Sequence, residues 1–292
     1  MTRLPRWITT HTAGLRALLV FTAVTGIVYP LAVLAAAQAP GLKDRADGSL
    51  VHNDEGEVVG SSLIGQSFTD EDGDAVEHYF QSRPSAAGEG YDPLNTSATN
   101  LGPEDVLDGP DGESLLTQVC SRSLAVGERE GVDGSRPYCA ESGDSAVGAV
   151  LGVFYSEGLT GDIVRVVSLN EVCGTVDRPF REEWKGAPVE CAEEGKEYDR
   201  AVVTPVRGDA PDEPEVPADA VTASASGLDP HISPEYAELQ VKRVAQARGM
   251  EESELESLVD RHTGGRALGF MGDPAVNVLE LNLDLDETRP VR

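Results

Sequence analysis

The pattern of hydrophobic and polar positions divides the chain unevenly. From Ala17 to Ala37 the sequence "ALLVFTAVTGIVYPLAVLAAA" carries no charged side chain. A helix of roughly 20 apolar residues crosses the hydrocarbon core of a bilayer, so this run predicts a transmembrane helix over 17–37. Pro30 interrupts the run, and a kink at that point is tolerated inside a membrane. We therefore expect an anchor at the N-terminus.

A cleaved secretory signal is the alternative interpretation of this run. Ala35 and Ala37 supply a small-x-small site after a basic start, and cleavage after Ala37 would release a secreted, disulfide-stabilised binding domain. The apolar stretch of a signal peptide is usually about 7 to 15 residues, however, and this one is longer. Its length favours a retained anchor.

The charges before the apolar run predict its orientation. Arg3, Arg6 and Arg16 precede it, and no acidic residue does. By the positive-inside rule, residues 1–16 are then cytoplasmic and the bulk of the chain, from about residue 38, is extracytoplasmic.

Shorter elements follow the anchor. Residues 48–68 predict two short strands joined by the polar turn "NDEGE". The stretches 102–114 and 207–220 are rich in Gly, Pro and acidic residues and indicate linkers. They bracket a cysteine-bearing segment, 109–215, whose apolar runs "AVGAVLGVFY" and "DIVRVVSLNEVCG" predict a strand-rich insert.

The C-terminal third has the clearest local signals. Ser233 precedes Pro234 and Glu235 in the pattern of a capped helix start, and Gly249 fits its end. A second short helix is predicted from about Glu252 to His262. The alternating leucines of 274–286 predict a half-buried strand.

Four cysteines lie in the part of the chain predicted to be extracytoplasmic: Cys120, Cys139, Cys173 and Cys191. None forms a CxxC pair, which favours two disulfides over a zinc site. Four cysteines allow three connectivities. We take the near-neighbour pairing, 120 with 139 and 173 with 191, as the expectation.

The charge balance excludes one class of partner. The chain has 51 acidic against 23 basic residues, a formal net charge of −28. Nucleic acid and anionic lipid are poor partners for such a surface. A solvated acidic surface is the simpler interpretation, and enrichment of cations near a transport entrance is the functional one.

The stretch "SASGLDPHISP" places Ser226, Asp229 and His231 close together and raises the question of a hydrolase site. A catalytic triad needs its imidazole between the other two groups, which one short turn cannot easily arrange. Gly227, Asp229 and Ser233 are instead typical of a turn that leads into a capped helix. No GxxxxGK[ST], GxGxxG, HExxH or DKTG motif occurs in the chain. We therefore expect no catalytic residues and no metal ligands.

Several stretches together resemble the C subunit of the Kdp-type potassium-transporting P-type ATPase. They are "TGIVYPL" (25–31), "GSSLIGQSF" (60–68), "YFQSRPSA" (79–86), "NLGP" (100–103), "VPADAVTASASGLDPHISPEYAELQVKRVAQARG" (216–249) and "VNVLELNLDLD" (276–286). The family commonly has proline where Lys242 stands and serine where Thr99 stands. It has only a short helical connection in place of 109–215, so the resemblance is silent on that insert.

The resemblance implies a single-pass bacterial plasma-membrane protein of the α+β class: one N-terminal transmembrane helix, then an extracytoplasmic mixed α/β domain (38–108 and 216–292). The strand-rich, disulfide-stapled insert inferred above interrupts this domain. It also implies an accessory subunit of a high-affinity potassium pump. The implied partners are a channel-like potassium-translocating subunit, a P-type ATPase catalytic subunit, a small single-span subunit and the lipid bilayer. A catalytic-chaperone role with ATP binding is implied too, although no residues can be assigned to the nucleotide.

Two groups of residues are predicted to meet the other subunits. In the anchor, small side chains allow close helix approach: Thr22, Thr25 and Gly26. In the external domain, the loop and helix of 226–249 are predicted to dock, with Asp229, His231, Gln240 and Arg243 at or under the interface. These four could equally serve only to hold the fold.

Overall fold

The computed structural model describes residues 5–53, 55–96, 101–110, 112–143 and 145–290. Arg3, Thr99 and Asn100, which enter the predictions above, lie outside these residues. The chain divides into two compact units, 1–63 and 64–292, and each is described here by itself.

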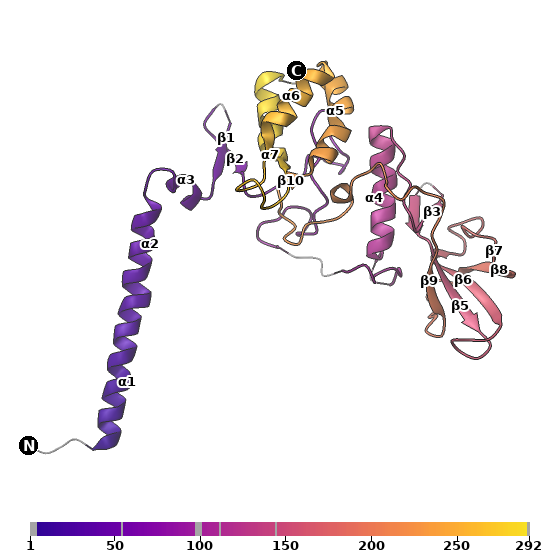
Figure 1. Cartoon of the computed structure of the whole chain (residues 1–292), viewed down its shortest axis with the longest axis horizontal. Helices are drawn as coiled ribbons and strands as arrows, with labels where there is room; N and C mark the ends of the chain where they lie inside the picture. The colour runs from indigo at the N-terminus through magenta and orange to yellow at the C-terminus, as the bar shows by residue number, and fades with distance from the viewer. Residues whose placement is uncertain (1–4, 54, 97–100, 111, 144, 291–292) are drawn as a thin grey trace, which may run out of the picture. The chain divides into compact units, whose positions relative to one another are not determined.

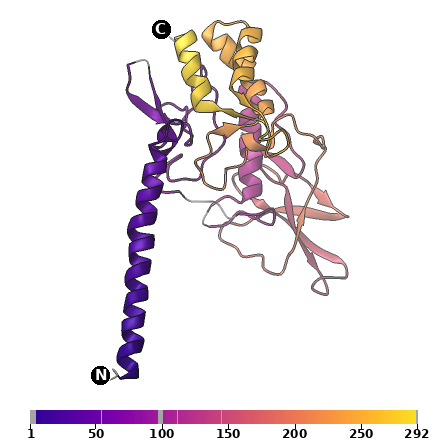
Figure 2. The same cartoon turned by 60° about the vertical axis from the view of Figure 1, so that its left-hand side comes forward.

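The N-terminal unit is dominated by one helix (Figures 1 and 2). It comprises α1 (Arg6–Ala23), one π-helical turn η1 (Val24–Val28) and α2 (Tyr29–Ala37). Its span, 6–37, has a most apolar window with a mean hydropathy of 2.2 and no buried residues, so it is long and apolar enough to cross a membrane. The π turn ends two residues before Pro30, which lacks the N–H that an α-helical ladder requires there.

The rest of this unit matches the expected hairpin. After the short helix α3 (Lys43–Ala46), β1 (Leu50–His52) pairs antiparallel with β2 (Val58–Ser61). Asn53 organises the turn, because its Oδ1 accepts hydrogen bonds from the backbone N–H groups of Glu55 and Glu57. The two predicted strands are confirmed.

Both predicted C-terminal helices are also confirmed. Helix α5 (Pro234–Arg248) begins after Ser233, whose Oγ accepts from the N–H of Tyr236, and ends at Gly249 with φ 63°. Only glycine adopts that left-handed angle without strain. Helix α6 (Glu252–His262) has the predicted bounds.

The prediction of a strand over 274–286 is wrong beyond its first residues. Only β12 (Ala275–Asn277) is extended, and α7 (Val278–Thr288) follows. Asn277 caps this helix by accepting from the N–H of Glu280. Its most buried positions, Val278, Leu279, Leu281, Asn282 and Leu285, follow helical spacing. The alternation of the leucines therefore coincided with a helical face.

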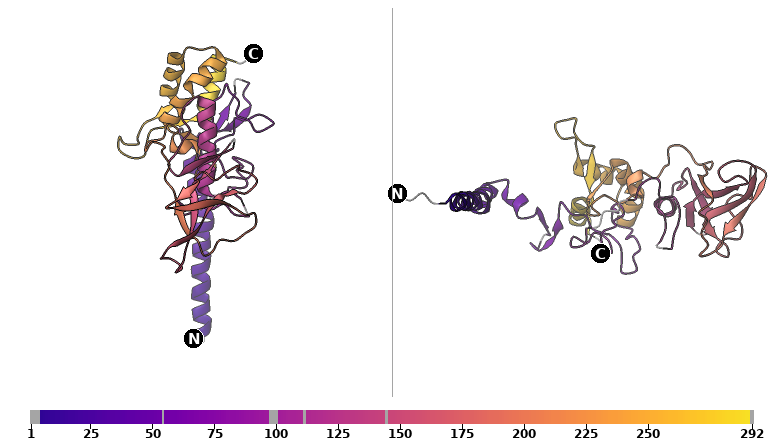
Figure 3. Two further views of the ribbon diagram at one scale, coloured as in Figure 1. Left: turned by 90° about the vertical axis from the view of Figure 1, so that its right-hand side faces the viewer. Right: turned by 90° about the horizontal axis from the view of Figure 1, so that it is seen from below.

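These helices surround a small antiparallel sheet (Figure 3). Its strand order is β10 (His231–Ile232), β12 and β11 (Thr263–Gly264). Apolar side chains from α5, α6, α7 and β12 form the main core, together with Phe80 of the extended segment 79–86. Segments far apart in the sequence thus complete one domain.

A long helix occupies the start of the predicted insert. Helix α4 (Leu115–Glu130) begins after Ser114, whose Oγ accepts from the N–H of Thr117, directly after the predicted linker 102–114. Asp108 accepts three hydrogen bonds, two from Ser114 and one from the Thr117 hydroxyl. The linker is therefore fastened to the helix that it precedes.

The remainder of the insert is rich in strands, as expected. The hairpin of β3 (Cys139–Ser142) and β4 (Ser145–Gly148) packs on α4. A five-stranded mixed sheet follows in the order β7 (Glu183–Trp184), β8 (Ala187–Ala192), β6 (Ile163–Val172), β5 (Val150–Tyr155), β9 (Val202–Pro205). Residues of β5, β6 and β8 form a second apolar core with Val206.

Two disulfides staple this segment. Cys120 of α4 is bonded to Cys139 of β3, and Cys173 is bonded to Cys191 of β8. This is the near-neighbour connectivity among the three that the sequence allows. The fold is therefore mixed α/β, with one N-terminal apolar helix and two disulfides.

Candidate functional site

Arg83 joins the two most distinctive motifs of the chain, "YFQSRPSA" and the loop before α5. Its guanidinium group donates to the carbonyl oxygen of Thr222 from both Nε and Nη2, at 3.2 Å each, and to that of Ala223 at 3.4 Å. Its Nη1 lies 3.3 Å from a carboxylate oxygen of Asp229. One side chain therefore fixes the strap 222–229 against residues 82–85.

Asp229 holds His231 as well. Its Oδ1 accepts from the backbone N–H of His231 at 3.1 Å and lies 3.0 Å from Nδ1 of the ring. This hydrogen bond raises the pKa of His231 and lowers the pKa of Asp229. The side chain of Asp229 is 34% exposed and that of His231 is 45% exposed, so both remain accessible at the surface of this chain.

We expect this pair to make stability depend on pH. Because the folded-state pKa of His231 is raised from 6.5, its contribution is complete below that value and is lost as pH rises through the higher folded pKa. The contribution of Asp229 is lost only as pH falls through its lowered pKa. His231→Gln should therefore reduce the unfolding free energy most below pH 6.5, and progressively less as the pH rises through the raised folded-state pKa of His231.

Denaturant unfolding of the full chain in detergent across this pH range measures the effect. His52→Gln, at an exposed histidine in β1, is the control. A pH-independent loss in the His231 variant would contradict the proposed pairing.

The structure does not bring Ser226 to this histidine. Its Oγ accepts from the N–H of Leu228 at 3.1 Å and lies 3.5 Å from the hydroxyl oxygen of Ser224. Gly227 has φ 70°, and a Cβ there would lie 2.7 Å from the Cβ of Ala87. The stretch thus builds a tight turn, in line with the structural interpretation.

Two buried amides hold the extended segment that precedes Arg83. The carboxamide of Gln240 accepts from the N–H of Gln81 at 2.7 Å and donates to its carbonyl at 3.2 Å. The carboxamide of Asn282 does the same for Phe80, with both distances 2.9 Å. Side chains of α5 and α7 thereby replace the strand partners that residues 80–81 lack.

Two of the four docking residues predicted in the external domain therefore lie inside this chain. Gln240 is fully buried, and the side chain of Arg243 is 9% exposed. Arg243 donates to both carboxylate oxygens of Glu130, to Gln240 Oε1 and to the carbonyl oxygens of Glu77 and Tyr79. Sequence reasoning missed Glu130 and Asn282, although Asn282 stands on the helical apolar face of α7.

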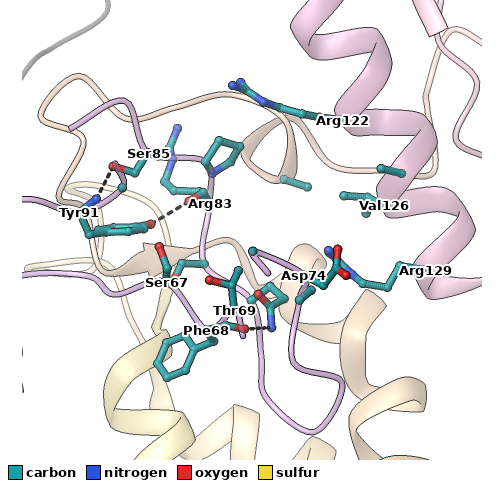
Figure 4. A pocket seen from close by; sticks show the side chains of 18 of the residues that line it. Ser67, Phe68, Thr69, Asp74, Arg83, Ser85, Tyr91, Arg122, Val126 and Arg129 are labelled. Carbon is teal, nitrogen blue, oxygen red and sulfur yellow. Dashed lines mark hydrogen bonds between the residues drawn. The ribbon is translucent and has the colours of Figure 1, made fainter. Parts of the chain in front are cut away.

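A cavity of about 370 Å³ opens beside Arg83 (Figure 4). Arg122, Val126 and Arg129 of α4 form one wall, and the opposite walls come from 67–75 and 81–91. Within it the Tyr91 hydroxyl donates to the carbonyl of Arg83 at 2.8 Å, and burial raises the pKa of Tyr91 to about 12.

The residues present do not fit a nucleotide in this cavity. The guanidinium groups of Arg83 and Arg122 already donate to carbonyl oxygens of 221–223, and Asp74 and Glu89 also line the walls. Within the described residues, no group of three or more His, Cys, Asp or Glu side chains could hold a metal ion for a triphosphate. We therefore assign no step to ATP.

The three predicted anchor residues lie on the exposed surface of the N-terminal helix. The hydroxyl of Thr25 donates to the carbonyl oxygen of Phe21 at 2.7 Å, so its hydrogen-bond donor is satisfied without a partner chain. A Cβ at Gly26 would meet only the Cγ2 of Thr22, at 4.0 Å. The chain itself therefore leaves open space at this position.

Comparison with known proteins agrees with the motifs. The family described as "KdpC: K+-transporting ATPase, c chain" matches residues 11–125 and 190–287. A potassium-transporting ATPase KdpC subunit of Kineococcus radiotolerans is 38% identical over 277 residues, which cover 95% of this chain and 93% of the relative. Those of Koribacter versatilis and Mycobacterium tuberculosis are each 35% identical, with 93% and 94% of this chain covered and 91% and 95% of the relative. The chain therefore belongs to the KdpC family, the C chains of K+-transporting ATPases.

Proposed function

We propose that the chain acts outside the cytoplasm as the membrane-anchored accessory subunit of a Kdp potassium pump, and that it assembles with the channel-like, P-type ATPase and small single-span subunits. The observation that carries this proposal is the family match, which includes most of the apolar helix and the domain built around α5 and α7. The pump imports K+ at the expense of ATP, and this chain supports that coupling without catalytic residues of its own.

Two features support an extracytoplasmic position for the bulk of the chain. Arg6 and Arg16 precede the apolar run, and the first 37 residues contain no acidic side chain. The two disulfides are of the kind that persists in oxidising compartments. The anchor would then be single-pass, with its N-terminus in the cytoplasm.

Within the assembly we assign different roles to the predicted docking residues. Asp229 and His231 are accessible and would face a neighbouring subunit. Gln240 and Arg243 are buried and would act indirectly, by fixing the segment that carries Arg83. Residues 126–189 of the insert lie outside the family match, so we assign them no shared role.

Affinity purification tests the assembly. A C-terminally tagged chain is recovered in mild detergent from membranes of potassium-starved cells, and its companions are identified by mass spectrometry. We expect a P-type ATPase and a channel-like membrane protein with the uncleaved chain. A tagged chain found alone in the medium, starting near Gln38, would refute both the anchor and the assembly.

The same purification tests the anchor surface. Replacing Gly26 with Leu should reduce recovery of the other subunits roughly fivefold, because the added side chain would separate closely packed helices. Gly14→Leu is the matched control, since a Cβ at Gly14 meets nothing within 4 Å and one at Gly26 only the Cγ2 of Thr22, at 4.0 Å. Equal recovery from both variants would exclude packing at Gly26.

A further inference from the structure

The loop between β11 and β12 displays apolar side chains to solvent. Leu268 is 83% exposed, Phe270 71% and Met271 52%. Figure 3 shows this loop projecting from the helical part of its domain. Among the described residues of 64–292, no other stretch of four residues exposes three large apolar side chains. Single exposed leucines need no explanation, but a cluster of this kind does.

The loop is a built structure. The backbones of Ala267 and Met271 exchange two hydrogen bonds, of 2.8 and 2.9 Å, and the N–H of Gly269 donates to the carbonyl of Arg266 at 3.0 Å. At its base Arg266 lies 2.9 Å from Asp273. Leu268 is held at φ 55°, an angle that costs a leucine free energy. The fold thus maintains a strained turn whose effect is to present these side chains.

The charges beside the loop differ from those of the whole chain. Residues 260–273, "DRHTGGRALGFMGD", contain two arginines and two aspartates, so their formal charges balance in a chain where acidic residues outnumber basic ones by 51 to 23. Arg261 and Arg266 are 59% and 49% exposed, and they pair with Asp284 and Asp273. An apolar tip with a locally neutral base suits the membrane interface, where the tip enters the acyl boundary. The acidic surface elsewhere would oppose that approach.

We propose that Leu268, Phe270 and Met271 insert into the interfacial region of the bilayer that holds the anchor. The tip lies within the part of the chain that the family match covers, unlike residues 126–189 of the insert, so we place this contact in the shared domain. The apolar helix 6–37 keeps a bilayer at high effective concentration around the domain, so a contact of three side chains suffices without high intrinsic affinity. The loop is thereby a second, shallow attachment to the membrane.

Local fluorescence in vesicles tests the proposal with the full chain. All four native cysteines are paired, so Leu268→Cys or Phe270→Cys introduces a single thiol for an environment-sensitive dye. The labelled chain is reconstituted alone into phosphatidylethanolamine and phosphatidylglycerol vesicles, with and without nitroxide-labelled lipid. Leu159→Cys is the matched control, because Leu159 is 79% exposed between β5 and β6 of the insert.

At positions 268 and 270 we expect the dye to emit at shorter wavelength and at least about twofold more brightly than the same dye on a short peptide in detergent-free buffer. The lipid nitroxide should quench this emission. Position 159 should stay water-like and unquenched. Water-like emission at 268 and 270, or equal quenching at 159, would overturn the proposal. A second reconstitution that includes the other pump subunits distinguishes a protein contact. A blue shift that appears only in that sample and is not quenched by the lipid nitroxide would also overturn the proposal, because the tip would then bind protein. The assay needs no partner subunit, so its failure leaves the purification result untouched.

Discussion

Glu130→Gln should destabilise the unit formed by residues 64–292 by about 3–5 kcal/mol, the cost of breaking a buried ion pair from one side. The Glu130 side chain is fully buried and accepts from Nε of both Arg129, at 2.7 Å, and Arg243, at 3.0 Å. The isosteric amide keeps the shape but leaves two guanidinium groups without their carboxylate. Unfolding of the full chain in detergent by denaturant, followed by circular dichroism, measures the loss.

Glu128→Gln is the control for this variant. Glu128 lies on the same helix, α4, but is exposed, so its loss should be within about 0.5 kcal/mol. A double variant, Glu130→Leu with Arg243→Met, should recover part of the stability because no charge then remains uncompensated between the helices. If Glu130→Gln and Glu128→Gln unfold at the same denaturant concentration, the ion pair does not hold α4 to α5.

The second large effect is expected at Asn282. Asn282→Leu has nearly the same shape but leaves the N–H and C=O of Phe80 unpaired in a fully buried position. Each orphaned group costs about 1–3 kcal/mol, so the variant, with two such groups, should lose about 2–6 kcal/mol. The amide of Phe80 should also exchange its hydrogen faster, which hydrogen exchange with mass spectrometry reports locally.

Glu287→Leu provides the comparison, since Glu287 is exposed on the same helix, α7. It should change neither the midpoint nor the exchange of Phe80. Retention of wild-type stability and exchange in Asn282→Leu would mean that the buried amide does not support the extended segment.

The elements that the sequence predicted correctly are those with local signals. Local interactions set the capped start of α5, its glycine end and the bounds of α6. Such interactions involve residues close together in the sequence, so they can be recognised from it. The apolar helix and the hairpin of 50–61 were equally local. The strand content of the insert followed from its apolar runs.

The sequence was misleading where two patterns overlap, and it was silent where partners are remote. In α7 the leucines at 279, 281 and 283 alternate as in a strand. Val278, Leu281 and Leu285 also follow helical spacing, and the N-cap at Asn277 favours the helix. Gln240 and Arg243 were predicted to lie at or under a docking interface, or only to hold the fold, and the structure places both in the interior of this chain. Their partners are more than a hundred residues away, so their burial could not be inferred from spacing.

The amide of Asn282 has a consequence for the order in which the protein is made. It bonds to Phe80, 202 residues earlier in the chain, and the Tyr79 hydroxyl likewise donates to Asp286. At about 5–20 residues per second, a ribosome needs roughly 10–40 s between the two. The apolar helix is therefore synthesised long before the C-terminal domain can close, and Tyr79 and Phe80 must wait for these partners until almost the last residue has been added.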